Sequence, residues 1–302
     1  MEVTRLNQMG TGTYSIAAYD PQFQEWGVGV QSRFLSVGAL VPWVSSNTGA
    51  IATQAKTNSM YGTRAFELIN NGKDAKQVVE TLISEDPQSD YRQVGVVDAQ
   101  GNVSAHTGNK CIGFAGHKLD TNFVCQGNLL VGEGVLDEMV RGFKTAEGDL
   151  ADKLVASLQG AQNAGGERRG VQSAALLIKK NAKNMFGQCN SYIDLRVDDS
   201  QSPLLELNRL KNLHRILFAQ NHSDKYFEFD TEIKKKLVII LQEIKEIDQT
   251  LAPHENMESV IENFSVKKGY KKDEVFKGNF INGKIINEIV NTYYSYEPEH
   301  YT

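Results

Sequence analysis

Apolar residues near the start of the chain occur in short runs separated by polar segments, a pattern typical of antiparallel strands. Residues 13–19 and 26–32 flank the polar stretch 20–25 and predict a hairpin. Two more short apolar runs, at 37–43 and 49–54, predict two further strands. The first part of the chain is therefore expected to be a block of neighbouring strands.

Helical periodicity then appears in two pairs of segments. Ser59 and Asp74 are candidate N-caps of the first pair, and the second pair starts near Val135 and Leu150. Strand patterns resume between and after these pairs, at 93–98, 103–106, 112–116, 122–126, 171–179 and 192–197. Hairpin-linked strands that alternate with helix pairs favour antiparallel sheets covered by helices. The pattern predicts an α+β fold with two sheets face to face and a helix layer on each side.

The composition changes after Ser202 and Pro203, where a long helix is expected to begin. Beyond a polar linker, the chain is richer in Lys, Glu, Asn and Tyr, and helices are expected at 231–247, 257–264 and 281–293. The sequence therefore predicts an N-terminal extension over residues 1–12, a domain of sheets and helices over 13–220, and a small α-helical domain over 226–302.

The amino-acid composition argues against nucleic acid as a partner and against a membrane-embedded chain. The chain has 302 residues, of which 40% are hydrophobic and 23% charged, as expected of a globular protein that is not membrane-embedded. Its net charge of −5 gives no basic excess for nucleic acid. No apolar run approaches the roughly 18 residues of a membrane span, and the first residues lack the apolar core of a signal peptide. The expected location is cytoplasmic, or periplasmic or cell-surface if a signal has been removed.

Cofactor motifs are not found. The sequence has no Cys-x-x-Cys or His-x-x-x-His pair and no glycine-rich phosphate loop, so neither a metal nor another cofactor is expected.

The candidate chemistry lies at the Gly12–Thr13 bond, where the first predicted strand begins. If this bond is cut, Thr13 gains a free α-amine and carries a nucleophile and a base on one residue. Hairpin pairing places Ser32 and Arg33 beside Thr13. This arrangement predicts an amide hydrolase in which Arg33 orients the substrate or supports the base. Without cleavage, Thr13 is an ordinary strand residue and Arg33 an ordinary solvent-facing strand end.

Eight segments follow one another from residue 13 to about residue 215: TYSIAAYD (13–20), GVGVQSRF (27–34), VGALVPW (37–43), GAIATQA (49–55), YRQVGVVD (91–98), HTGNKC (106–111), QGNLL (126–130) and GGERRGVQSAALL (165–177). In this order they resemble one bacterial family, the domain-of-unknown-function family 1028. The resemblance implies an Ntn-hydrolase-like fold, a four-layer αββα sandwich, which agrees with the order of strand and helix blocks. For residues 226–302 it implies the peptidoglycan-binding domain that follows in some members.

The same resemblance suggests the site residues. In Ntn hydrolases the nucleophile begins the first strand of the sandwich, a place that Thr13 matches; Ser15, on the same side of the strand, is the alternative. The segment Gln126-Gly127-Asn128 resembles turns in which a backbone N–H and an asparagine amide form an oxyanion hole, so Asn128 is a candidate donor. A glycine-containing turn without catalytic function is the other interpretation.

Polar residues elsewhere are candidates for substrate binding. Arg168 and Arg169 precede a predicted strand and can bind a carboxylate, with Gln172 close by in sequence. A solvated loop or a subunit contact would explain the two arginines equally well. Gln54 and Asn58 end the fourth predicted strand and are expected to line the cleft.

Two functions remain open at this point. The leading hypothesis is an Ntn-type amidohydrolase that acts on a small, carboxylated or neutral amide and forms a homo-oligomer. The alternative is a non-catalytic binding or assembly protein, with the sandwich as scaffold and the C-terminal domain holding a partner such as a peptidoglycan fragment. Twelve residues precede Thr13, and an intact amide nitrogen is no base. The chain is therefore a precursor, a form that has not matured, or a fold used without this chemistry.

Overall fold

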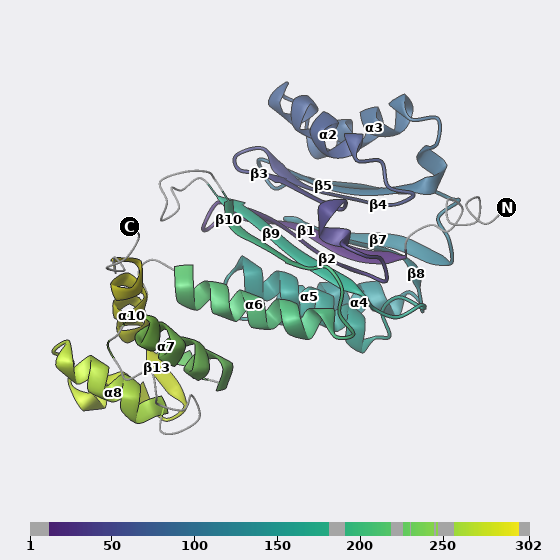
Figure 1. Ribbon diagram of the computed structural model, residues 1–302. Helices are drawn as coiled ribbons and strands as arrows, with labels where there is room; N and C mark the ends of the chain where they lie inside the picture. Colours follow the sequence, from purple (N-terminus) through teal and green to yellow (C-terminus); the bar gives the residue numbers. More distant parts are fainter. Residues whose placement is uncertain are drawn as a thin grey trace, which may run out of the picture. The chain divides into compact units, whose positions relative to one another are not determined.

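Figure 1 shows the computed structural model of the chain, which describes residues 12–180, 191–218, 226–229, 231–244, 246 and 257–295. The chain divides into two compact units, Met1–Lys211 and Asn212–Thr302. The predicted linker at 221–224, the extension before residue 12 and the end of the chain after residue 295 lie outside the described residues.

The first unit contains a six-stranded antiparallel sheet in the order β10-β9-β2-β1-β8-β7. Its strands are β1 (Thr13–Asp20), β2 (Glu25–Ser32), β7 (Phe114–Asp120), β8 (Phe123–Leu130), β9 (Ser173–Lys180) and β10 (Ser191–Val197). The predicted hairpin of β1 and β2 is confirmed, with Thr13 opposite Ser32. On its other side β1 pairs with β8, which places Thr13 opposite Asn128. Thr13 therefore lies at the start of a central strand, with a polar residue beside it on each neighbouring strand.

A second sheet of the same unit has four antiparallel strands in the order β3-β4-β5-β6. They are β3 (Pro42–Ser45), β4 (Gly49–Ala55), β5 (Arg92–Asp98) and β6 (Val103–Thr107). The expectation of one strand over 37–43 is wrong, because this segment forms a 3₁₀ turn, η1 (Val37–Ala39), before β3 begins. Ser36 adopts a left-handed conformation with φ of 55°, which bends the chain away from an extended path.

Helices cover the outer faces of both sheets (Figure 1). Helices α2 (Met60–Asn70) and α3 (Ala75–Glu85) pack on the smaller sheet, where Leu68 and Leu82 share a core with Val94. On the larger sheet lie α4 (Gly134–Thr145), α5 (Leu150–Asn163) and α6 (Pro203–Phe218). A third core lies between the sheets and combines Val28 of β2 with Val97 of β5. The unit is thus a mixed α+β structure of antiparallel sheets and covering helices.

The predicted helix caps have different outcomes. Asp74 caps α3 as expected, since its side chain accepts a hydrogen bond from the backbone of Gln77 in a reciprocal capping box. Ser59 does precede α2, but its side chain makes no capping hydrogen bond. Instead, the Asn58 side chain accepts a hydrogen bond from the backbone N–H of Met60 at 3.1 Å.

The second unit contains the predicted helices and, in addition, a small sheet. The helices are α7 (Thr231–Glu243), α8 (Met257–Lys267), α9 (Lys272–Val275) and α10 (Gly283–Ser295). The sheet has the order β11-β13-β12, formed by β11 (Tyr226–Glu228), β12 (Phe276–Lys277) and β13 (Phe280–Asn282). A purely helical unit was expected, because strands of two or three residues are too short to show a two-residue period.

A buried carboxyl group on β2 gives a testable pH dependence of stability. Glu25 Oε1 accepts a hydrogen bond from Lys180 Nζ at 3.3 Å, whereas Oε2 is buried with no hydrogen-bond partner among the described residues. Burial raises the pKa of Glu25 above its usual value, although Lys180 opposes the shift. The folded state therefore holds this proton more tightly than the unfolded state, and stability falls as the pH rises through the window above the usual glutamate pKa.

We accordingly expect Glu25→Gln to raise the melting temperature at about pH 7 and to leave it unchanged at about pH 3, where the carboxyl is protonated in both states. Thermal unfolding followed by circular dichroism across this pH range provides the measurement. The control is Glu80→Gln, which changes an exposed glutamate that only approaches Lys76 at 4.0 Å. A lower melting temperature for Glu25→Gln at neutral pH would show that the ion pair with Lys180 outweighs the burial of the charge.

Candidate functional site

Thr13, Ser32 and the carbonyl of Gly12 form a continuous hydrogen-bonded chain. The Thr13 hydroxyl is fully buried and donates to Ser32 Oγ at 3.0 Å. Ser32 Oγ in turn donates to the carbonyl oxygen of Gly12. The Ser32 hydroxyl therefore bridges the predicted nucleophile and the carbonyl group of the bond that would be cut.

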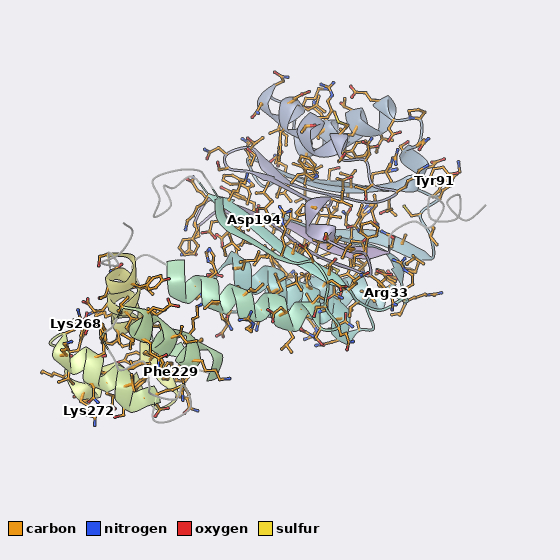
Figure 2. All side chains as sticks on the ribbon, viewed as in Figure 1. Arg33, Tyr91, Asp194, Phe229, Lys268 and Lys272 are labelled. Atoms are coloured by element: carbon orange, nitrogen blue, oxygen red, sulfur yellow. The ribbon has the colours of Figure 1, made fainter. Side chains whose placement is uncertain are left out.

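Arg33 extends from the end of β2 toward the segment that precedes β9. Its backbone N–H donates to Glu167 Oε2 at 2.8 Å, and its guanidinium Nη1 donates to the carbonyl oxygen of Arg169 at 2.5 Å. The side chain is exposed at the surface of the first unit (Figure 2). Arg33 thus joins the end of the hairpin to the arginine segment, where a guanidinium can orient an anionic group.

Glu167 lies directly against Gly12, a neighbour that the sequence did not reveal. A Cβ atom on Gly12 would stand 2.5 Å from both Cδ and Oε1 of Glu167. The glutamate side chain is itself buried, and Arg169 Nε donates to its Oε1. Burial raises the pKa of Glu167, while hydrogen bonds from Arg169 and Arg33 oppose the shift. The only signal in the sequence is a single acidic residue beside two arginines.

Gln54 of β4 holds the main chain of Thr13 from the opposite sheet. Its Nε2 lies 3.3 Å from the Thr13 carbonyl oxygen, and its Oε1 accepts a hydrogen bond from Ser15 Oγ at 2.6 Å. Gln54 is fully buried. Gln54 therefore holds the main chain of the candidate nucleophile Thr13. The hydroxyl of the alternative nucleophile, Ser15, is hydrogen-bonded to the same Gln54 amide.

Gln93 of β5 is a second neighbour of the candidate site that sequence reasoning missed. Its Oε1 accepts hydrogen bonds from Gln54 Nε2 at 2.8 Å and from Asn128 Nδ2 at 3.1 Å. The only sequence signal was a polar residue inside an otherwise apolar strand. Gln93 thus joins the amides on the two sides of Thr13 into one buried network.

The segment that contains Asn128 is a strand, so the expected turn is wrong. Residues 126–128 belong to β8, in which residues 123–128 pair with β1. The chain bends only at Leu129, whose φ is 54°. The Asn128 amide points to Gln93, and Asn128 faces Thr13 across the pair of strands. Gly127 suggested a turn. In the structure, a Cβ atom at this position would clash with the side chain of Leu130, which explains why a glycine stands here.

The side chains of Arg168 and Gln172 bind groups other than Thr13, although the Gln172 backbone N–H donates to the carbonyl oxygen of Ser32 at 3.0 Å. Arg168 Nε donates to the Leu130 carbonyl at 3.0 Å, and Gln172 Nε2 donates to Asp199 Oδ1 at 3.0 Å. Arg169 is different, because its Nη2 is buried without a hydrogen-bond partner among the described residues. Of the arginine pair, Arg169 is therefore the one with a donor available near Glu167.

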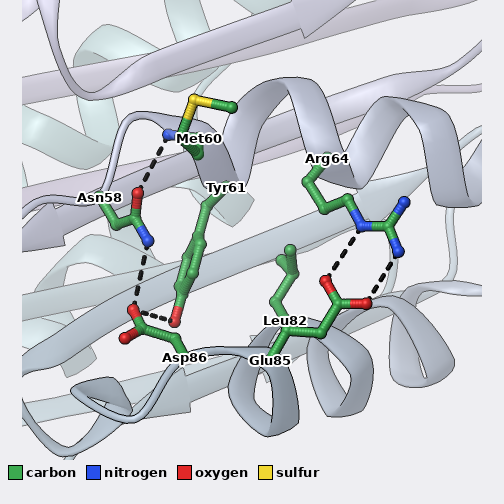
Figure 3. Close-up of a pocket in the computed structure, with 7 residues that line it drawn as sticks. All are labelled: Asn58, Met60, Tyr61, Arg64, Leu82, Glu85 and Asp86. Atoms are coloured by element: carbon green, nitrogen blue, oxygen red, sulfur yellow. Dashed lines mark hydrogen bonds and ion pairs between the residues drawn. The ribbon is translucent and has the colours of Figure 1, made fainter.

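Asn58 lines a separate pocket between α2 and α3, shown in Figure 3. The pocket measures about 250 Å³ and is lined by Asn58, Met60, Tyr61, Arg64, Leu82, Glu85 and Asp86. Asn58 Nδ2 donates to Asp86 Oδ2 at 3.2 Å. Burial alone would raise the pKa of Asp86, but hydrogen bonds from the Gln88 backbone and from Arg92, Asn58 and Tyr61 lower it to about 2. This ionised carboxylate joins the helices to β5.

Neither a metal-binding cluster nor a membrane-spanning helix occurs in the described part of the chain. Over the described ranges, no three His, Cys, Asp or Glu side chains gather closely enough to hold a metal ion. No helix in the described part of the chain is both long and apolar enough to span a membrane.

The chain is similar to known proteins both in sequence and in fold. Residues 13–207 match a family of unknown function, DUF1028. The fold is similar to the crystal structure of a DUF1028 protein from Silicibacter pomeroyi, with a TM-score of 0.62 and 26% identity. That similarity covers 68% of this chain and 89% of the other. Among curated proteins, none matches the chain.

Proposed function

Because the chain belongs to the DUF1028 family, whose function is unknown, we propose a function from the site itself: an Ntn-type amidohydrolase with Thr13 as nucleophile. The observation that carries the proposal is the hydrogen-bonded chain from Thr13 through Ser32 to the Gly12 carbonyl. Helices outside two facing sheets support the related proposal that the first unit is the αββα sandwich of Ntn hydrolases (Figure 1). Thr13 begins a central strand, where such an enzyme carries its nucleophile.

The chain of hydroxyl groups supports a self-cleavage step. Thr13 Oγ1 attacks the Gly12 carbonyl carbon, its proton passes to Ser32 Oγ, and the Ser32 proton passes to the carbonyl oxygen. When the tetrahedral intermediate collapses, the carbon–nitrogen bond breaks, and the proton on the former carbonyl oxygen passes to the Thr13 nitrogen, which becomes a free α-amine. Gly12 is then held as an ester on Thr13 Oγ1. Water hydrolyses this ester, which releases Gly12 as a carboxyl group and restores the Thr13 hydroxyl.

The freed amine then serves as the base for the substrate reaction. It takes the proton from Thr13 Oγ1 as this oxygen attacks the carbonyl carbon of a small amide. Gln54 Nε2, close to the Thr13 carbonyl oxygen, keeps the main chain of the nucleophile in place. The amine product leaves with a proton, and water releases the acyl group from the ester.

Two guanidinium groups favour a substrate that carries a carboxylate. Arg169 Nη2 is a buried donor with no acceptor in the described structure, and the exposed Arg33 is bonded to the carbonyl of Arg169. Guanidinium groups bind carboxylates through paired, charge-assisted hydrogen bonds. We therefore place the carboxylate of the substrate near Arg169.

Self-cleavage is expected to slow by about 100-fold or more in Ser32→Ala, because the proton relay between Thr13 and the Gly12 carbonyl is lost. Intact-mass measurements on freshly made protein, taken over time, give the rate. Ser157→Ala, which truncates another fully buried serine of the same unit, is the matched control and should cleave normally. If Ser32→Ala matures as fast as the wild-type protein, the relay is wrong.

A further inference from the structure

The position of Gly12 indicates which acyl groups the site accepts. Thr13 Oγ1 attacks the Gly12 carbonyl during self-cleavage and the substrate carbonyl afterwards, so both carbonyls occupy the same place. This step rests on the proposed function. On that basis we infer that the preferred substrates are amides whose acyl group has an unbranched carbon beside the scissile carbonyl, as in a glycyl amide. Glu167 occupies the space beside Gly12 where such a branch would lie.

The space beside Glu167 restricts which residue can stand at position 12. A Cβ atom there would lie 2.5 Å from Glu167 Cδ and Oε1 and 2.8 Å from Cγ. Carbon atoms in contact are normally about 3.5–4.0 Å apart, so Glu167 would have to move.

Glu167 is not free to move. Its Oε2 accepts the backbone N–H of Arg33 at 2.8 Å, and its Oε1 accepts Arg169 Nε. The side chain is fully buried, so no rotation into solvent relieves the clash. An acyl group with an L-side chain therefore clashes with the Glu167 side chain, whereas a glycyl group fits. Discrimination of this kind is expected to reach about 100-fold.

The first test measures self-cleavage in a double-mutant cycle. Gly12→Ala is expected to slow cleavage by about 100-fold, because its methyl group meets Glu167. The double variant Gly12→Ala/Glu167→Ala should cleave at a rate within about 10-fold of that of Glu167→Ala alone, because the side chain that clashes with the methyl group has been removed. Glu147→Ala, which truncates an exposed glutamate, is the control and should not rescue Gly12→Ala.

The second test measures kcat/KM of the matured protein, residues 13–302, on glycyl and L-alanyl p-nitroanilides. The wild-type protein should prefer the glycyl compound by about 100-fold, and Glu167→Ala should reduce that preference below about 10-fold. Normal cleavage of Gly12→Ala, or a preference that Glu167→Ala leaves unchanged, would overturn the inference. A wild-type chain that neither cleaves itself nor hydrolyses any amide would instead overturn the proposed function on which it rests.

Discussion

Thr13→Ala is expected to abolish amide hydrolysis, with kcat/KM falling by at least about 1,000-fold on every substrate. The change removes the oxygen that attacks the carbonyl carbon, and no other group takes its place. Alanine fits the same buried strand position, so the fold should persist with the loss of one hydrogen bond to Ser32. The measurement is the hydrolysis rate on matched neutral and carboxylated amides, of which the wild-type protein should prefer the carboxylated ones.

Two control variants separate chemistry from packing in this experiment. Thr53→Ala truncates another fully buried threonine, on β4, and should retain wild-type activity. Thr13→Ser keeps the hydroxyl group and should retain both cleavage and hydrolysis. If Thr13→Ala remains as active as the wild-type protein, Thr13 is not the nucleophile.

The largest effect on stability is expected for Gln93→Met, which should lower the free energy of unfolding by about 3 kcal/mol. Gln93 Nε2 lies 2.9–3.0 Å from Thr107 Oγ1 and from the carbonyl oxygens of Gly116 and Gly127. Its Oε1 accepts the amides of Gln54 and Asn128. Methionine has a similar size but leaves these buried polar groups without their partner, and each unsatisfied group opposes folding.

Urea unfolding at neutral pH measures this change through the transition midpoint. Gln100→Met, at an exposed position in the turn after β5, is the matched control and should shift the free energy by less than about 0.5 kcal/mol. A loss below about 1 kcal/mol for Gln93→Met would mean that water or neighbouring residues replace its hydrogen bonds.

Local features of the fold can be predicted from the sequence. Pairing across the short turn after β1 is enough to place Ser32 beside Thr13, because hairpin register follows from loop length. Asp74 was recognisable as a cap for the same reason, since its partner Gln77 is three residues away. In both cases the interacting residues are close in sequence.

Contacts between segments that are distant in sequence could not be predicted from the sequence. Glu167 reaches Gly12 only because the segment before β9 passes beside the start of β1, and no local pattern encodes that approach. Gln93 likewise becomes a central residue only when β5 faces β8 of the other sheet. The side chains of Arg168 and Asn58 donate hydrogen bonds to Leu130 and Asp86, which are distant in sequence. Residue type alone does not distinguish these outcomes.

The intact mass of the purified protein, combined with N-terminal sequencing, shows whether Thr13 becomes the N-terminal residue. We expect a product with the mass of residues 13–302 and a free Thr13 at its N-terminus, whereas Thr13→Ala should keep the mass of all 302 residues. A wild-type protein that retains the full mass after prolonged incubation, with no Thr13 amine detected, would contradict the proposal that Thr13 is an N-terminal nucleophile.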